Sequence, residues 1–191
     1  KTTSNVKTTA GMKAQADAAT KQKEGEDMIF KKRLARHHDE LRWLYMELYG
    51  NDDMFAELCD QMKQYYDARN EKLKKLDAER EAEGEWYRKR DMLGMMMYID
   101  NFAGNIKGVQ EKLPYLEECN VNYIHLMPFL DSPNGRSDGG YAVADVRKVK
   151  PELGTMDDLA ELAENCHDKS ISLGMDFVKN QSSEDQAWGR R

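Results

Sequence analysis

The chain has 191 residues, of which 40% are apolar and 34% charged, and its formal net charge is −6. This length is enough for one sizeable domain with a small appendage. A mean hydropathy of −0.86, with no apolar run near the ~18 residues that span a bilayer, excludes a transmembrane helix. The acidic balance argues against a nucleic-acid-binding surface, because such surfaces need cations to neutralise phosphates.

The three cysteines, Cys59, Cys119 and Cys166, are odd in number and widely spaced. They form neither a disulfide framework nor a CxxC motif, so we expect free thiols in a reducing, cytoplasmic compartment. No His, Cys and carboxylate cluster has zinc spacing, and no D-x-D-x-D-G loop is present for calcium. We therefore expect neither a metal nor a cofactor.

The first part of the chain predicts a lead-in followed by a helical domain. Residues 1–24 are polar and lack the apolar core of a secretory signal, so we expect them to be disordered. Residues 25–90 form the predicted helical domain and linker. Apolar residues at helical spacing predict a helix over 28–49 that ends at Gly50 and a second helix over 54–80.

Residues 91–191 show a different pattern, which predicts an α/β fold with parallel strands. Three short apolar runs predict buried strands at 95–99, 123–127 and 171–178. Between them lie predicted helices over 107–119 and over 156–169, the second of which Thr155 should cap. Pro114 should bend the first of these helices or shift its start. A long glycine-rich loop is expected at 129–153.

This loop carries the most informative motif, because ligands of parallel α/β folds bind beyond the carboxyl ends of the strands. In Ser137–Tyr141 two glycines separate a carboxylate, Asp138, from an aromatic ring, Tyr141. A carboxylate that accepts hydroxyl hydrogen bonds and a ring that packs on C–H groups suit a carbohydrate. A surface turn with an incidental tyrosine is the alternative interpretation.

The order of several segments resembles the opening of the catalytic barrel of the α-amylase superfamily, glycoside hydrolase family 13. Five segments carry this resemblance: YIDNFAG at 98–104, HLMP at 125–128, SDGGYAV at 137–143, LGT at 153–155 and MDFVKN at 175–180. The SDGGYAV segment and the helical domain are most similar to the amylosucrase branch. The resemblance implies an all-α domain followed by the first three strands of a (β/α)8 barrel, which needs roughly 250 residues when complete.

The same resemblance implies a retaining α-glucosyltransferase that acts on sucrose, releases fructose and lengthens an α-1,4-glucan. Such a reaction needs two carboxyl groups about 5 Å apart, one a nucleophile and the other a general acid/base. In the family these groups lie on later strands, so we expect residues 1–191 alone to be inactive. The remaining part of the barrel is therefore an expected partner, together with sucrose and α-glucan.

The resemblance assigns roles to five positions. Asp138 matches the carboxylate at the base of the glucosyl pocket, and Tyr141 matches the aromatic that stacks on the glucosyl ring. Asp176 and Asn180 match the supporting residues of the D-x-x-x-N-H motif. The histidine that ends this motif is replaced by Gln181, which can donate a hydrogen bond to substrate but cannot titrate near neutrality.

Two other functions remain open at this point. The chain could come from an α-glucosidase, a sucrose hydrolase or a trehalose synthase of the same superfamily. Alternatively, it could be a non-catalytic remnant or a helical interaction module, as the departures at Lys179 and Gln181 would favour. We expect His125, on the second strand, to be a histidine whose hydrogen bonds are satisfied within the barrel wall.

Overall fold

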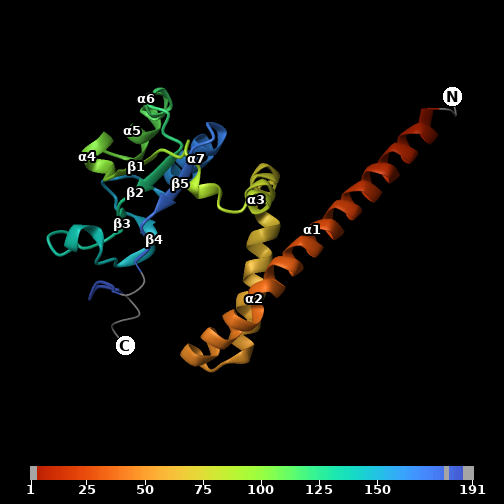
Figure 1. Ribbon diagram of the computed structural model, residues 1–191, viewed down its shortest axis with the longest axis horizontal. Helices are drawn as coiled ribbons and strands as arrows, with labels where there is room; N and C mark the ends of the chain where they lie inside the picture. The colour runs from red at the N-terminus through yellow and green to blue at the C-terminus, as the bar shows by residue number, and fades with distance from the viewer. Residues whose placement is uncertain (1–3, 179–180, 187–191) are drawn as a thin grey trace. The chain divides into compact units, whose positions relative to one another are not determined.

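The computed structural model describes residues 4–178 and 181–186. Contacts cluster within residues 1–84 and within residues 85–191, so the chain forms two separate units (Figure 1). The first unit is helical, and the second contains helices and strands. Of the helices in the described part of the chain, none is both long and apolar enough to cross a bilayer.

The first unit consists of the helices α1 (Ser4–Tyr49), α2 (Asp52–Ala68) and α3 (Glu71–Glu83). Helix α1 ends as predicted at Gly50, whose φ of +59° suits a residue without a side chain. The Asn51 side chain then caps α2 by accepting a hydrogen bond of 3.0 Å from the Met54 backbone N–H.

Helix α1 begins at Ser4, so it includes most of the 1–24 stretch for which a disordered lead-in is predicted. Lys and Ala, which together make up ten of these 24 residues, have high intrinsic helix propensity. The prediction relied on the lack of large apolar side chains, which speaks against burial but not against helical backbone.

The single helix predicted over 54–80 is wrong, because the structure divides it into α2 and α3. Arg69 adopts extended backbone angles of φ −66° and ψ 133°, and the Asn70 side chain caps α3 by accepting from the Lys72 N–H. Apolar periodicity continues through the break, whereas asparagine competes locally for backbone hydrogen bonds and can start a new helix.

The second unit is built on a parallel sheet of β1 (Gly94–Met97), β2 (Tyr123–Leu126) and β5 (Ser172–Met175), in the order β1-β2-β5. These are the three strands predicted from the apolar runs. The first ends before the predicted 95–99 run does, since Ile99 already begins a helix. The third covers only the middle of the predicted 171–178, so that Asp176 lies beyond its end. Both strand pairs are in register along their full length.

Four helices accompany the sheet: α4 (Ile99–Ala103), α5 (Ile106–Glu111), α6 (Leu113–Glu118) and α7 (Met156–Asp168). The single helix predicted over 107–119 is divided into α5 and α6, and Pro114 lies in the first turn of α6, so it is placed at a new helix start and not at a bend. A short 3-10 turn, Trp86–Arg88, precedes the sheet. The start of a (β/α)8 barrel is therefore present, with strands and helices in alternation.

The loop predicted at 129–153 contains a hairpin that the sequence analysis missed. Strands β3 (Leu130–Asp131) and β4 (Asp145–Val149) pair antiparallel, with a register shift between Leu130 and Asp131. A 3-10 turn, Asp138–Gly140, lies at the far end of this hairpin. Glycines and charges dominate the segment, and its strands are too short for an alternating pattern to be visible.

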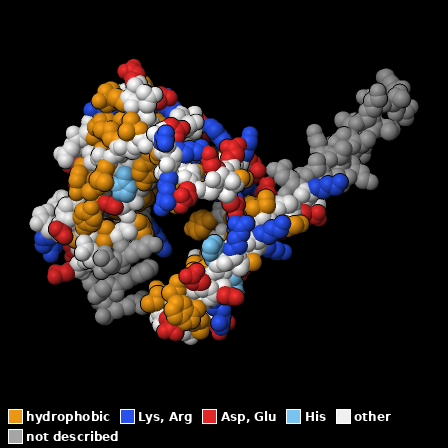
Figure 2. Space-filling model, viewed as in Figure 1, with side chains coloured by type: hydrophobic (Ala, Val, Ile, Leu, Met, Phe, Trp, Pro, Cys, Tyr) orange, Lys and Arg blue, Asp and Glu red, His pale blue; other side chains and the backbone are white. Residues whose placement is uncertain are grey.

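The two faces of the parallel sheet differ in burial. Ile124 and Leu126 point to the helices and are fully buried, together with Leu116 and Leu162. On the opposite face Met96 is 68% exposed. Figure 2 shows hydrophobic side chains at the surface of this unit. The face with Met96 is therefore open in this chain, as expected for the inner wall of a barrel that other strands would close.

A capping prediction follows from helix α7. The Thr155 hydroxyl accepts from the Asp158 backbone N–H at 3.1 Å, and the Asp158 carboxylate accepts from the Thr155 backbone N–H at 2.8 Å. We expect Thr155→Ala to lower the free energy of unfolding by about 1 kcal/mol. Urea unfolding followed by circular dichroism measures this change. Thr155→Ser keeps the hydroxyl and should retain the stability; an equal loss in both variants would contradict the role of the cap.

Candidate active site

Carbohydrate-binding candidates meet at the carboxyl edge of the parallel sheet, where the three strands end side by side. The Met127 N–H donates to the Met97 carbonyl at 2.9 Å, and the Asp176 N–H donates to the Leu126 carbonyl at 3.0 Å. These bonds extend the ladder one residue beyond each strand. They place Asp176, which follows β5, beside the end of β2.

The Asp176 carboxylate joins two of the predicted segments. The Tyr141 hydroxyl donates to its Oδ2 at 3.0 Å, although 35 residues separate the two side chains. Its other oxygen, Oδ1, lies 3.2 Å from Nε2 of His125. The structure thus brings Tyr141 and Asp176 together, and it confirms that the hydrogen bonds of His125 are satisfied.

Tyr141 owes its position to a tight turn. The Gly140 N–H and the Ala142 N–H both donate to the Ser137 carbonyl at 2.9 Å. Gly140 has a φ of +96°, and a Cβ at this position would lie 2.9 Å from the Pro128 carbonyl oxygen. Only glycine therefore allows the turn to pack closely on the end of β2.

Asp138 belongs to the same turn, and its carbonyl accepts from the Tyr141 N–H at 3.1 Å. It has the left-handed φ of +48° that Asp tolerates better than most residues. The Asp138 side chain is exposed and has no hydrogen bond or ion pair with any residue that the structure describes. Its carboxylate is therefore available to a ligand at this edge.

The remaining two predicted residues are placed less fully. Gln181 is exposed, and no hydrogen bond joins it to Asp138, Tyr141 or Asp176 within residues 4–178 and 181–186. Asn180 lies outside the described residues. The structure therefore brings together the turn and the end of β5, but not the complete D-x-x-x-N-Q segment.

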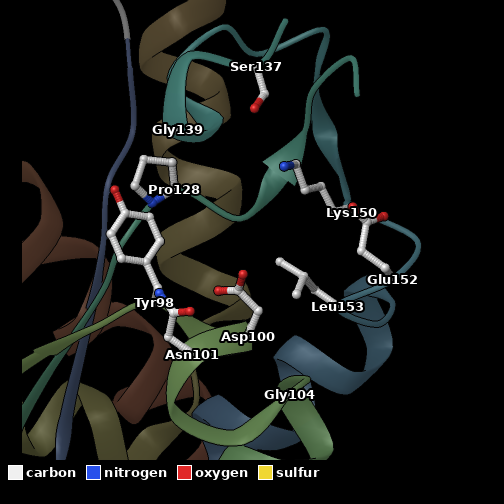
Figure 3. A pocket seen from close by; sticks show the side chains of 10 residues that line it. All are labelled: Tyr98, Asp100, Asn101, Gly104, Pro128, Ser137, Gly139, Lys150, Glu152 and Leu153. Carbon is white, nitrogen blue, oxygen red and sulfur yellow. The ribbon is translucent and has the colours of Figure 1, made fainter. Parts of the chain in front are cut away.

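A cavity of about 540 Å³ adjoins the turn (Figure 3). It shares Tyr98 and Gly139 with the turn region, since the Tyr98 hydroxyl would lie 3.7 Å from a Cβ on Gly139. In Figure 3 the Asp100 carboxylate and the Lys150 ammonium point into the cavity. Neither has an ion-pair partner among residues that the structure describes. Volume and polar lining fit a small polyhydroxylated ligand.

The electrostatics of the site centre on Tyr141. The hydrogen bond to Asp176 raises the pKa of Tyr141 above its ordinary value, and burial and the negative charge of Asp176 act in the same direction. Tyr141 therefore keeps its proton and remains a donor to Asp176. In the described part of the chain, no group of three or more His, Cys, Asp or Glu side chains is arranged to hold a metal ion.

The effect of Asp176 on the pKa of Tyr141 can be tested directly. We expect Asp176→Asn to lower the pKa of Tyr141 towards the ordinary value of about 10, because the neighbouring negative charge is removed. The titration of tyrosine labelled with ¹³C at Cζ, followed by NMR against pH, measures this change, with Tyr141→Phe to assign the signal. An unchanged Tyr141 titration would show that Asp176 does not raise its pKa.

Two aromatic residues at this edge, Tyr123 and Tyr98, were not predicted as site residues. The Tyr123 hydroxyl lies 3.3 Å from Nδ1 of His125, and Tyr98 approaches the turn at Gly139. Tyr123 and His125 alternate along β2, so they share one face of the sheet. This period-two spacing near the carboxyl end of a strand was the available signal.

The comparison with protein families identifies the barrel. Residues 63–191, more than half of the chain, match the family described as "Alpha amylase, catalytic domain". The chain belongs to the alpha-amylase family. Its parallel sheet is therefore the start of an alpha-amylase (β/α)8 barrel, and the candidate site lies where alpha-amylase barrels, like others, place their active sites.

Similar curated proteins come from the same family. Over 85 residues the chain is 39% identical to probable oligo-1,6-glucosidase 3 of Bacillus subtilis. The aligned segment covers 44% of this chain and 15% of that protein. Over 86 residues it is 40% identical to the trehalose synthase/amylase TreS of Mycobacterium tuberculosis, and this segment covers 45% of this chain and 14% of TreS. The aligned part thus spans about one seventh of these relatives' length.

Solved structures give the same result. A mutant of trehalose-6-phosphate hydrolase from Bacillus licheniformis superposes with a TM-score of 0.51 and 32% identity, over 56% of this chain and 20% of that one. A MutB mutant in complex with its substrate sucrose superposes with a TM-score of 0.50 and 31% identity, over 56% and 20%. Both are similar to the chain only at the start of an alpha-amylase barrel.

Proposed function

We propose that this chain is the opening part of an amylosucrase-like α-glucosyltransferase, which transfers glucosyl units from sucrose to an α-1,4-glucan and releases fructose. In this proposal residues 25–90 form the helical domain and linker, and residues 91–191 contribute the first part of the catalytic barrel. The observation that supports a sugar site at this edge is the hydrogen bond between Tyr141 and Asp176, next to the turn that carries Asp138.

The proposed division of labour follows from the chemistry. Asp138 accepts hydrogen bonds from glucosyl hydroxyl groups, and the Tyr141 ring packs against the C–H face of the sugar. Asp176 accepts a hydrogen bond from the Tyr141 hydroxyl and therefore fixes the position of the ring. Asn180 supports the same motif, and Gln181 donates an amide hydrogen bond to the sugar. No cofactor is needed for transfer between sugars.

Bond cleavage requires two further carboxyl groups, a nucleophile and a general acid/base, about 5 Å apart. We propose that these groups come from residues outside 1–191, on later strands of the barrel. The residues described here would then bind and orient the glucosyl unit, and the other part of the barrel would carry out the displacement.

The product distribution tests this function. The full-length enzyme is incubated with sucrose and glycogen, and glucan, glucose and fructose are measured over time. Fructose release together with growing glucan supports the transferase. Equal release of glucose and fructose, without glucan growth, would replace it by a hydrolase, and no reaction with sucrose would reject both.

The relatives favour a second candidate function. Proteins named as oligo-1,6-glucosidase and trehalose synthase share 39% and 40% identity with this barrel segment. An α-glucosidase or trehalose synthase would use the same Asp138, Tyr141 and Asp176. It would release glucose from isomaltose or convert maltose to trehalose, and parallel incubations with those two sugars distinguish it. A non-catalytic remnant would act on none of them.

The unusual Gln181 gives a further prediction. We expect Gln181→His in the full-length enzyme to raise kcat/KM for sucrose about fivefold, since a charge-assisted hydrogen bond exceeds a neutral one by about 1 kcal/mol. Initial-rate kinetics near pH 6, where histidine is partly protonated, measure the change. Gln186→His is the matched control and should leave kcat/KM unaltered. A decrease in Gln181→His would show that this position does not face the sugar.

A further inference from the structure

Two side chains on β2 are not used by the proposed function. Tyr123 and His125 lie two residues apart and therefore project from the same face of the sheet. The parallel register places Gly174 of β5 directly opposite His125. This is the open face, on which Met96 is 68% exposed.

Hydrogen bonds connect these two residues to the candidate site. The Tyr123 hydroxyl lies 3.3 Å from Nδ1 of His125, and Nε2 of His125 lies 3.2 Å from Oδ1 of Asp176. The other carboxylate oxygen accepts from the Tyr141 hydroxyl at 3.0 Å. Four side chains thus form one continuous hydrogen-bonded chain that ends at the sugar-facing tyrosine.

The direction of each hydrogen bond follows from the groups involved. A carboxylate only accepts, so Nε2 of His125 must carry the proton that it donates to Asp176. In the neutral imidazole Nδ1 is then an acceptor, and it accepts from the Tyr123 hydroxyl. The Tyr123 hydroxyl therefore favours the tautomer that can hold Asp176.

Gly174 leaves room for this arrangement. A Cβ at this position would lie 2.4 Å from the Tyr123 hydroxyl oxygen and 3.1 Å from Cζ. The Gly174 backbone is not in the left-handed region, so local conformation does not demand glycine. Space for the Tyr123 hydroxyl is the requirement that the structure shows.

We propose that Tyr123 and His125 are positioning residues for the glucosyl site. Tyr123 fixes the Nε2–H tautomer of His125, His125 fixes the Asp176 carboxylate, and Asp176 fixes the ring of Tyr141. Only the effect on sugar transfer rests on the proposed function. The tautomer of His125 and the sequence of hydrogen bonds from Tyr123 to Tyr141 do not depend on it.

The tautomer is tested first, without any substrate. Long-range ¹H–¹⁵N NMR of the 191-residue chain reports the protonation of each imidazole nitrogen, and His125→Gln assigns the signal among the four histidines. We expect a proton on Nε2 and none on Nδ1 of His125 at pH 9, where imidazole with the ordinary histidine pKa of about 6.5 is neutral. Tyr123→Phe should give a mixture of tautomers. A proton on Nδ1 in the unmodified chain, or an unchanged tautomer in Tyr123→Phe, would overturn the proposal.

Gly174→Ala provides a second variant, in which none of the four hydrogen-bonded residues is itself replaced. The new methyl group should displace the Tyr123 hydroxyl from Nδ1 of His125 and give the same mixture of tautomers as Tyr123→Phe. An unchanged tautomer in this variant would contradict the steric part of the argument.

The activity arm uses the full-length enzyme and sucrose. We expect Tyr123→Phe to lower kcat/KM about five- to tenfold, the fold-change that corresponds to one hydrogen bond. His125→Ala should lose about a hundredfold, because misplacement of a binding group is costly. His125→Gln, which keeps an N–H donor for Asp176, should recover part of that loss. Tyr87→Phe, at an exposed position, is the matched control.

The outcomes separate this proposal from the proposed function. Altered tautomers with unaltered kcat/KM would overturn positioning, even if sucrose is the substrate. Altered tautomers with equal losses in His125→Gln and His125→Ala would reduce His125 to a structural role. If sucrose is not a substrate, the proposed function fails, and the same variants are measured on the α-glucoside that the enzyme does use.

Discussion

Replacing Asp176 by alanine is expected to lower kcat/KM for sucrose by about a thousandfold in the full-length enzyme. This carboxylate holds both Tyr141 and His125, at 3.0 Å and 3.2 Å. Hydrogen bonds to a charged group are worth about 1.5–3 kcal/mol each, so two of them correspond to about 10²- to 10⁴-fold. Steady-state kinetics with sucrose measure the loss.

Two further variants give this prediction its control. Asp176→Asn retains the shape and one acceptor, so we expect it to lose less activity than Asp176→Ala. Glu161→Ala removes an exposed carboxylate from helix α7 and should leave kcat/KM unaltered. If Asp176→Ala lost less than tenfold, Tyr141 would be held by other contacts. A lower melting temperature in Asp176→Ala alone would indicate a folding defect.

The predicted site was partly visible in the sequence. The order of the segments predicted that Ser137–Tyr141 lies beyond the second strand, at the carboxyl edge, but it placed Asp176 within a strand over 171–178. In the structure β5 ends at Met175, so Asp176 follows the strand and meets Tyr141 at this edge. The sequence could not show that they touch. That contact depends on the turn at Gly140, which packs on Pro128, and on the strand order β1-β2-β5.

The hydrogen bonds from Tyr123 through His125 to Asp176 were harder to predict, for a different reason. Tyr123 and His125 lie in an apolar run, where a histidine is usually a satisfied wall residue. Which partner satisfies it depends on the parallel register that sets Gly174 opposite His125. His125 and Gly174 are 49 residues apart in the sequence, so their pairing is a property of two distant strands and cannot be read from the residues around His125 alone.

The fold errors have local causes. The periodic apolar residues of 54–80 continue across Arg69 and Asn70, and periodicity does not register the side-chain cap that ends one helix and begins another. The hairpin of β3 and β4 involves strands of two and five residues. Strands this short carry too little alternation for a pattern to be recognised.

Replacing Gly108 by alanine is expected to destabilise the α/β unit strongly, although the higher helix propensity of alanine alone would predict stabilisation. Gly108 lies within α5, where alanine is normally favoured over glycine by about 1 kcal/mol. However, a Cβ at Gly108 would lie 2.1 Å from the Ala103 carbonyl oxygen. This oxygen belongs to the backbone at the end of α4, so one helix must move away from the other. We expect a loss of about 3 kcal/mol in the free energy of unfolding.

Urea unfolding followed by far-UV circular dichroism measures this loss. The sign of the change in the free energy of unfolding shows whether helix propensity or the clash with the Ala103 carbonyl oxygen is the larger effect. Gly135→Ala is the matched control, because its Cβ would meet no atom within 4 Å while its φ of +72° is left-handed. It should lose only the conformational cost of about 1–2 kcal/mol. A stabilised Gly108→Ala would show that α4 and α5 can separate freely. Because α4 follows Tyr98 and carries Asp100, such freedom would also loosen the cavity beside the Ser137–Tyr141 turn.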